Sequence, residues 1–258
     1  MAQTDPLYRR IADQLRRQIT VGDYPPGQRL PTEPELMETF SASRNTIRLA
    51  LAALANEGLV ATEHGRGTFV RERKTFTYHA ARAERPDRQT SWNTDAYFDE
   101  VRGAGRKPSQ TFSMRMEPAR AEVAARLHVP EDDLVVLRKV TRYLDDQPWS
   151  DQDSWYPMDV SETAGLAVPH DLAQGAVRAM ADAGYVEVGH VDELTARMPT
   201  PDEVRTLSLS SGVPVMVYVR TAWTNERPVR VTRTIFPADR NRIVYELGEL
   251  NAYDGKLS

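Results

Sequence analysis

Hydrophobic positions in the first 60 residues follow the period of α-helices. Leucine and isoleucine recur every fourth position from Leu7 to Ile19, which predicts an amphipathic helix over residues 6–20. A stretch rich in glycine and proline then ends the pattern. Thr32 and Glu35 have the spacing of a capping box, so a second, short helix is expected to follow them.

A third helix is expected after the short turn SAS. Ser43 can cap it, and Gly58 has the place of a C′ glycine at its end. Arg44 and Arg48 lie four residues apart and share an exposed stripe near its start. Such an arginine pair is usually solvated, so taken alone it decides nothing. Two short helices joined by a three-residue turn are nevertheless typical of a helix-turn-helix.

The stretch LVATEHGRGTFV predicts two strands joined by a tight hairpin. Gly65 and Gly67 can adopt positive φ without strain, as such a turn requires. His64 and Arg66 make the tip cationic, which a turn alone does not need. The order helix, helix-turn-helix, hairpin within about 65 residues is that of a small DNA-reading module.

The rest of the chain has a different pattern. A polar, aperiodic stretch is expected to form a linker over residues 73–91. Strand-like and helical segments then alternate, and two of them share one layout, in which a helix started by proline precedes a strand hairpin. The fold class predicted is therefore α+β, with an antiparallel sheet in the second domain.

Composition and charge narrow the function. The chain has 258 residues, no cysteine and a net charge of −4, and no apolar run approaches the roughly 18 residues of a membrane span. Residues 1–75 hold eleven Lys and Arg against nine Asp and Glu, whereas the remainder is acidic. No signal peptide is visible, and a cytoplasmic protein is expected. The histidines lack metal-ligand spacing, and neither a catalytic constellation nor a cofactor motif is present.

Residues 6–70 resemble the winged-helix head of the GntR family of bacterial transcription regulators. The resemblance rests on the motifs PLY, PPGQRLPTE, SRNTIRLAL, EGLV and GRGTFV. It implies that the third helix enters the major groove of DNA, with Arg44 at a guanine edge. It also implies that the hairpin is a wing whose tip reaches the minor groove. Pro34 stands where many relatives carry a basic DNA-contacting residue.

The resemblance assigns a DNA-binding role to eight residues. Phosphate contacts are expected from three of them, and Asn45 is left open between a base and the backbone. At the wing, Gly65 is expected to act with His64 or Arg66. The full set is Ser43, Arg44, Asn45, Thr46, Arg48, His64, Gly65 and Arg66.

Residues 92–247 resemble, more loosely, the UTRA effector domain, whose fold is similar to that of chorismate lyase. The whole chain therefore resembles the HutC subfamily, and some segments look like actinomycete members. Relatives that bind phosphorylated amino sugars use a serine, strand arginines and a glutamate. The matching positions here are Ala96, Val140 with Arg142, and Gln152. This difference indicates a less anionic ligand.

Three residues are the candidate effector contacts: Tyr97, Arg142 and Gln152. Arg142 could equally form a surface ion pair, and Tyr97 could simply fill the core. The leading hypothesis is a homodimeric transcription factor, a repressor released from a palindromic operator by a small molecule. It has domains at 1–72 and 92–250. A metabolite-transforming enzyme with a DNA-tethering head is the alternative, and regulation without an effector is a third, weaker one.

Overall fold

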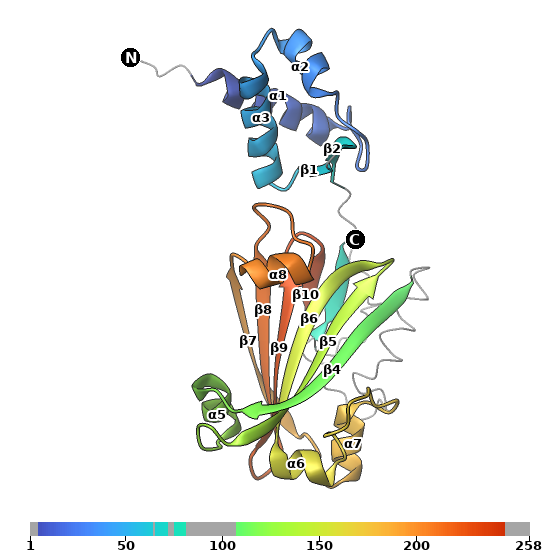
Figure 1. Ribbon diagram of the computed structural model, residues 1–258, viewed down its shortest axis with the longest axis vertical. Coiled ribbons are helices and arrows are strands. Elements are labelled where there is room, and N and C mark those ends of the chain that lie inside the picture. The colour runs from blue at the N-terminus through green and yellow to red at the C-terminus, as the bar shows by residue number, and fades with distance from the viewer. Residues whose placement is uncertain (1–4, 64, 72–74, 81–106, 246–258) are drawn as a thin grey trace. The chain divides into compact units, whose positions relative to one another are not determined.

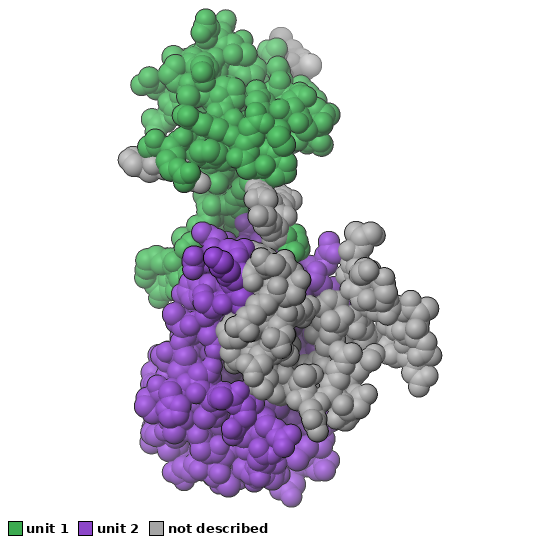
Figure 2. Space-filling model, turned by 90° about the vertical axis from the view of Figure 1, so that its right-hand side faces the viewer, with its two compact units in different colours: residues 1–75, 198–214 green, residues 76–197, 215–258 purple. Residues whose placement is uncertain are grey.

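The computed structural model describes residues 5–63, 65–71, 75–80 and 107–245 (Figure 1). The chain forms two compact units, coloured separately in Figure 2. The first comprises Met1–Thr75 with Met198–Pro214, and the second Phe76–Arg197 with Val215–Ser258. The division at residue 75 falls within the expected linker. The boundaries 1–72, 73–91 and 92–250 stay a prediction.

All three helices expected in the first unit are present: α1 (Leu7–Val21), α2 (Glu33–Phe40) and α3 (Arg44–Asn56). The predicted cap of α3 is confirmed, because Ser43 Oγ accepts a hydrogen bond from the Thr46 N–H at 3.2 Å. The apolar faces of the three helices meet in one core. Its fully buried helical members are Ile11, Ala12, Leu15, Leu36, Ile47, Ala50, Leu51 and Leu54.

The predicted hairpin is confirmed as strands β1 (Val60–Glu63) and β2 (Gly67–Val70), which pair antiparallel. The segment that precedes α2 also pairs with β2, and its Leu30 N–H donates to the Thr68 carbonyl at 2.8 Å. Gly67 has φ of 120°, and a Cβ there would lie 2.6 Å from Arg29 Nε. Glycine is therefore required at the base of this hairpin.

The second unit is built on a six-stranded antiparallel sheet with strand order β4-β5-β6-β9-β8-β7 (Figure 1). The hairpin turn between β5 and β6 has positive φ at Asp145 and Asp146, as a two-residue turn requires. The strands are β4 (Pro108–Pro118), β5 (Leu134–Leu144), β6 (Gln147–Pro157), β7 (Gly189–Arg197), β8 (Val215–Trp223) and β9 (Pro228–Pro237).

The expected duplication is confirmed by the order of the elements. A strand, a short helix and a hairpin follow one another twice, first as β4-α5-β5-β6 and then as β7-α8-β8-β9. The helices are α5 (Ala121–Leu127) and α8 (Pro201–Thr206). The last strands of the two copies, β6 and β9, pair at the centre of the sheet.

Four further elements complete the described chain. Two helices, α6 (Met158–Thr163) and α7 (Ala176–Asp182), share a small core with the sheet. The sequence predicts a longer helix from residue 171, but α7 begins only after Gly175, whose φ is 75°. The other two elements are β3 (Phe76–His79) and β10 (Asn241–Val244), which form a parallel pair. β3 lies within the segment expected to be a linker, where periodicity gave no sign of a strand.

Candidate DNA-binding face and ligand cavity

The N-terminal end of α3 presents a polar face. Ser43, Arg44, Asn45 and Arg48 are exposed, and Thr46 is half-buried at the cap. The opposite side of the helix is held in the core, so packing fixes which residues point outward. The structure thus exposes four of the eight predicted DNA-contacting residues at the N-terminal end of α3 and leaves Thr46 half-buried beside them.

One acidic residue on α2 accompanies the two arginines of this face. The Glu33 carboxylate lies 3.7 Å from Arg44 Nε and 3.6 Å from Arg48 Nε. Both arginine side chains remain about two-thirds exposed, at 65% and 69%. Glu33 is not predictable from the sequence, because no local pattern tells which carboxylate at a helix start meets the next helix. Its charge partly offsets the positive potential of this face.

The wing tip contributes two more of the predicted residues. Gly65 has φ of 73°, and nothing lies within 4 Å of where its Cβ would be. Arg66 is exposed, with its guanidinium carbon 5.7 Å from the centre of the Phe69 ring. His64 lies outside the described residues. The tip is therefore open and cationic, as a groove-reaching wing requires.

The second unit contains a cavity on one face of its sheet, with about 80 Å³ open to the centres of water molecules. About 10–15 Å³ of this measure accommodates one water, so several waters or a small ligand fit. Every lining residue from β4, β5, β6, β8 and β9 has an even number, as expected for one side of a pleated sheet. Residues between Asp171 and Val177, at the start of α7, line it from outside the sheet.

The structure brings two of the three predicted effector residues together in this cavity. Arg142 on β5 donates from Nη1 to Gln152 Oε1 on β6 at 2.9 Å. Tyr97 lies outside the described residues, as does Ala96. Other polar lining residues were not predicted from the sequence, although those on β5 and β6 share the two-residue period of Arg142 and Gln152. The missed residues are Gln110, Arg138, Ser154, Asp171, Arg220, Arg230, Thr232 and Thr234.

Two of the cavity arginines form buried, two-pronged ion pairs. Arg220 donates from Nε and Nη2 to Asp192, at 2.7 Å each, and Arg230 donates likewise to Glu187 at 2.8 Å. Burial alone would raise the pKa of both carboxyls, but the paired guanidinium outweighs it and leaves each pKa lowered. These arginines and carboxylates are therefore charged together, and their charges cancel locally.

A third cavity arginine is held mainly by backbone. Arg138 donates to the Leu166 carbonyl at 2.8 Å and to the His170 carbonyl at 3.2 Å. Its Nη2 also lies 3.4 Å from Asp171 Oδ1, and its guanidinium carbon lies 4.5 Å from the centre of the Phe112 ring. These contacts join β5 to the loop before α7 and so shape the cavity wall.

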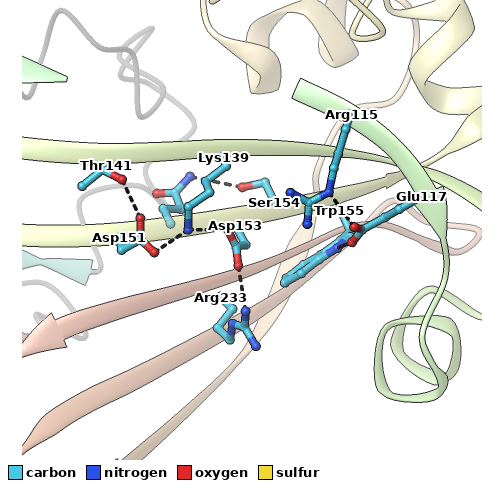
Figure 3. Close-up of polar contacts among 10 residues, drawn as sticks. Arg115, Glu117, Lys139, Thr141, Asp151, Asp153, Ser154, Trp155 and Arg233 are labelled. Atoms are coloured by element: carbon cyan, nitrogen blue, oxygen red, sulfur yellow. Dashed lines mark hydrogen bonds and ion pairs between the residues drawn. The ribbon is translucent and has the colours of Figure 1, made fainter. Parts of the chain in front are cut away.

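The opposite face of the sheet carries its own ionic network (Figure 3). Lys139 lies between Asp151, to which it hydrogen-bonds, and Asp153, which is 3.2 Å away. Arg233 extends the network by donating to Asp153 Oδ2 at 2.7 Å, and Thr141 donates to Asp151 at 2.6 Å. Burial would lower the pKa of Lys139, but the two carboxylates outweigh it and leave the pKa raised. The charged groups of this network thus pair with one another.

Within the described part of the chain, no group of three or more His, Asp or Glu side chains is placed to hold a metal ion. No helix among these residues is long and apolar enough to cross a membrane. The geometry thus offers a cationic helix face with a wing in one unit and a polar cavity in the other.

Comparison with known proteins decides the family. Residues 7–70 match the bacterial regulatory proteins of the gntR family, and residues 104–242 match the UTRA domain. The chain belongs to the GntR family of transcriptional regulators. As a GntR regulator with a UTRA domain, of the HutC type, it is a DNA-binding transcriptional regulator and not an enzyme, which rejects the enzyme alternative.

Relatives span nearly the whole of this GntR regulator. An HTH-type transcriptional regulator from Rhizobium meliloti (strain 1021) is 32% identical over 244 residues, 93% of this chain and 94% of its own. The histidine utilization repressor of Pseudomonas putida is 29% identical over 92% of this chain and 90% of its own. A crystal structure of a GntR-family transcriptional regulator superposes with a TM-score of 0.65, at 27% identity, over 95% of this chain and 98% of that one. The predicted winged helix with a UTRA domain is thus confirmed.

Proposed function

We propose that this regulator is a homodimeric repressor acting in the bacterial cytoplasm. It binds a palindromic operator and is released by a small-molecule effector. The names of its relatives support repression, since they include a histidine utilization repressor and a repressor of mannosyl-D-glycerate transport and metabolism from Escherichia coli. A two-fold dimer presents two recognition helices to half-sites in successive major grooves, which accounts for a palindrome.

The observation that carries this proposal is the exposed end of α3. Arg44 reads a base edge in the major groove, because its planar fork can pair with guanine O6 and N7. Ser43, Thr46 and Arg48 bind phosphates and set the register. Asn45 contacts either a base or the backbone.

The wing and the cavity complete the proposed machinery. Gly65, with Arg66 or His64, enters the minor groove beside α3. The cavity of the second unit binds the effector through Arg142 and Gln152, with Tyr97 as a further contact. Effector binding favours one of two dimer arrangements and so changes the fit of the heads to the operator. In this proposal residues 1–72 bind DNA, and residues 92–250 bind effector and form the dimer.

Selection of bound sequences from a random DNA pool tests the function directly. The purified chain should enrich a palindrome, and its affinity for that sequence should fall steeply with salt while exceeding that for random DNA. Arg44→Ala should lose the preference. Arg178→Ala, which removes another exposed arginine, this one from the second unit, should retain it. Equal binding of selected and random DNA by the unmodified chain would refute the proposal.

A further inference from the structure

A chain of hydrogen bonds crosses the sheet side of the cavity, from one arginine to another. It begins where Arg142 donates to Gln152 and continues as Gln152 Nε2 donates to Ser154 Oγ at 3.1 Å. Ser154 Oγ lies 3.0 Å from Thr232 Oγ1, which accepts from Arg230 Nη1 at 2.8 Å. These side chains come from β5, β6 and β9, and all of them line the cavity. We call them the cavity floor.

The direction of these bonds leaves the floor with a surplus donor. Ser154 and Thr232 each accept from a group that can only donate at that contact. Their mutual bond uses one of their two hydroxyl hydrogens. The two hydroxyls therefore keep one O–H that must find an acceptor elsewhere.

Thr234 adds a second donor beside this chain. It is 4% exposed, lines the cavity, and its hydroxyl has no hydrogen-bond partner among the described residues. A buried hydroxyl costs free energy unless it is hydrogen-bonded, and the cavity is the space in which an acceptor can reach it. Two neighbouring positions on β9, Thr232 and Thr234, thus point to the same requirement.

The surrounding charges limit how negative that acceptor is. Glu187 and Asp192 accompany Arg230 and Arg220, and Asp171 lies 3.4 Å from Arg138. Each of these three arginines already has a carboxylate partner. A dianionic ligand would therefore be repelled by the carboxylates without being attracted by an unpaired charge on any of the three. The floor itself offers donors, whereas Gln110 Oε1 elsewhere in the cavity wall is a buried acceptor without a partner among the described residues.

We infer that the floor binds a singly charged carboxylate of the effector, held by hydroxyl donors from Thr234 and from the Ser154–Thr232 pair. This inference rests on the proposed effector role of the cavity and specifies its ligand class. The remaining walls carry Tyr78, Phe112 and Tyr218, whose rings suit an apolar or aromatic body behind the carboxylate.

Four probes that share a ring test the inference on the full chain: benzoate, benzamide, benzylamine and phenyl phosphate. Saturation-transfer NMR and titration give binding and dissociation constants. Benzoate should bind at low-millimolar concentration, at least about tenfold tighter than phenyl phosphate and than benzylamine.

Substitutions then locate the binding. Thr234→Val removes a hydroxyl that has no partner in the described protein, so the fold should tolerate it while benzoate binds about tenfold more weakly. Thr195→Val, on the exposed edge strand β7, is the matched control and should change nothing. Thr232→Val should weaken benzoate as well.

Three outcomes would overturn the inference: no benzoate binding at low-millimolar concentration, benzylamine binding as well as benzoate, or unchanged benzoate affinity in Thr234→Val. DNA selection on the same preparations is read separately. Loss of operator preference there would refute the repressor proposal without affecting the benzoate result, and the reverse also holds.

Discussion

Two groups of arginines in this protein do opposite work. Arg44 and Arg48, at the start of α3, are about two-thirds exposed and lie 3.6–3.7 Å from a single carboxylate, that of Glu33. Arg220 and Arg230, in the cavity, are less than a tenth exposed, and each makes two bonds of 2.7–2.8 Å to its own carboxylate. The first pair is loosely held and can exchange its partner for DNA. The second pair is committed, in the sense that each arginine already has its own buried carboxylate as counter-ion.

The difference shows that counting arginines does not reveal an anion site. Four arginines line the cavity, yet three of them hold protein carboxylates or carbonyls and serve to fix its walls. The hydroxyls between them are the groups left to meet a ligand. On α3 only two arginines are present, but exposure and weak pairing leave their charge available.

The largest expected effect comes from breaking a committed pair. Glu187→Gln should destabilise the second unit by about 3–5 kcal/mol, because a buried guanidinium loses its counter-charge. All four tryptophans lie beyond residue 91, so tryptophan fluorescence during urea unfolding reports on this unit and not on residues 1–75.

The matched control removes an exposed carboxylate from the same region. Glu193 pairs with Arg126 and is 48% exposed, so Glu193→Gln should cost no more than about 1 kcal/mol. Equal losses in the two variants would show that the Arg230 pair is not the committed contact that its geometry indicates.

Acid should have the next largest effect, in part through the committed pairs. The pKa values of Glu187 and Asp192 are lowered in the folded state, so their pairs add stability above the unfolded pKa of about 4. That stability is lost as the pH falls through the folded-state pKa values. The urea midpoint followed by tryptophan fluorescence should therefore drop between about pH 5 and pH 2. In the double variant Glu187→Gln, Asp192→Asn the drop should be shallower, and an identical slope would contradict the assignment.

The exposed pair should show its effect on DNA rather than on stability. Arg44→Ala should weaken binding to the selected sequence by about 1–3 kcal/mol, or roughly 5- to 150-fold, since a base-reading fork is lost. Stability should change by less than about 0.5 kcal/mol, because the side chain is exposed. Fluorescence anisotropy with labelled DNA measures the first, and thermal unfolding the second. A large stability loss with unchanged DNA affinity would mean that Arg44 stabilises the fold and does not bind DNA.

The sequence predicts most of the fold because its signals are local. Helix caps such as Ser43, the glycines of the hairpin and the two-residue period of the long strands each depend on a few neighbouring positions. The parallel pairing of β3 with β10 joins segments more than 160 residues apart, and no local pattern encodes it. The predicted start of this helix at residue 171 was wrong. The helix α7 begins only after Gly175, whose positive φ interrupts the helical pattern that precedes it.

The cavity was only partly predictable for the same reason. Arg142 and Gln152 were identified through family resemblance, and their period places Arg138 and Ser154 on the same face. Whether that face meets solvent or lines a cavity depends on the segment before α7, which lies elsewhere in the sequence. The partners of the arginines are equally distant, since Arg230 finds Glu187 43 positions away.

Glu33 yields the smallest and most specific prediction. Its carboxylate lies between two arginines of the DNA-binding face, so it should repel phosphates wherever α3 contacts a backbone without its cognate bases. Glu33→Gln should raise affinity for random DNA by up to about fivefold, the equivalent of an exposed ion pair of about 1 kcal/mol. Affinity for the selected sequence should gain less, because the two arginines lose a contact that orients them, and the ratio of the two affinities should fall. Glu38→Gln, which removes the same charge from another exposed position of α2, is the control. Equal gains on random DNA in both variants would mean that net charge alone is responsible, and that Glu33 has no particular part in keeping Arg44 and Arg48 selective.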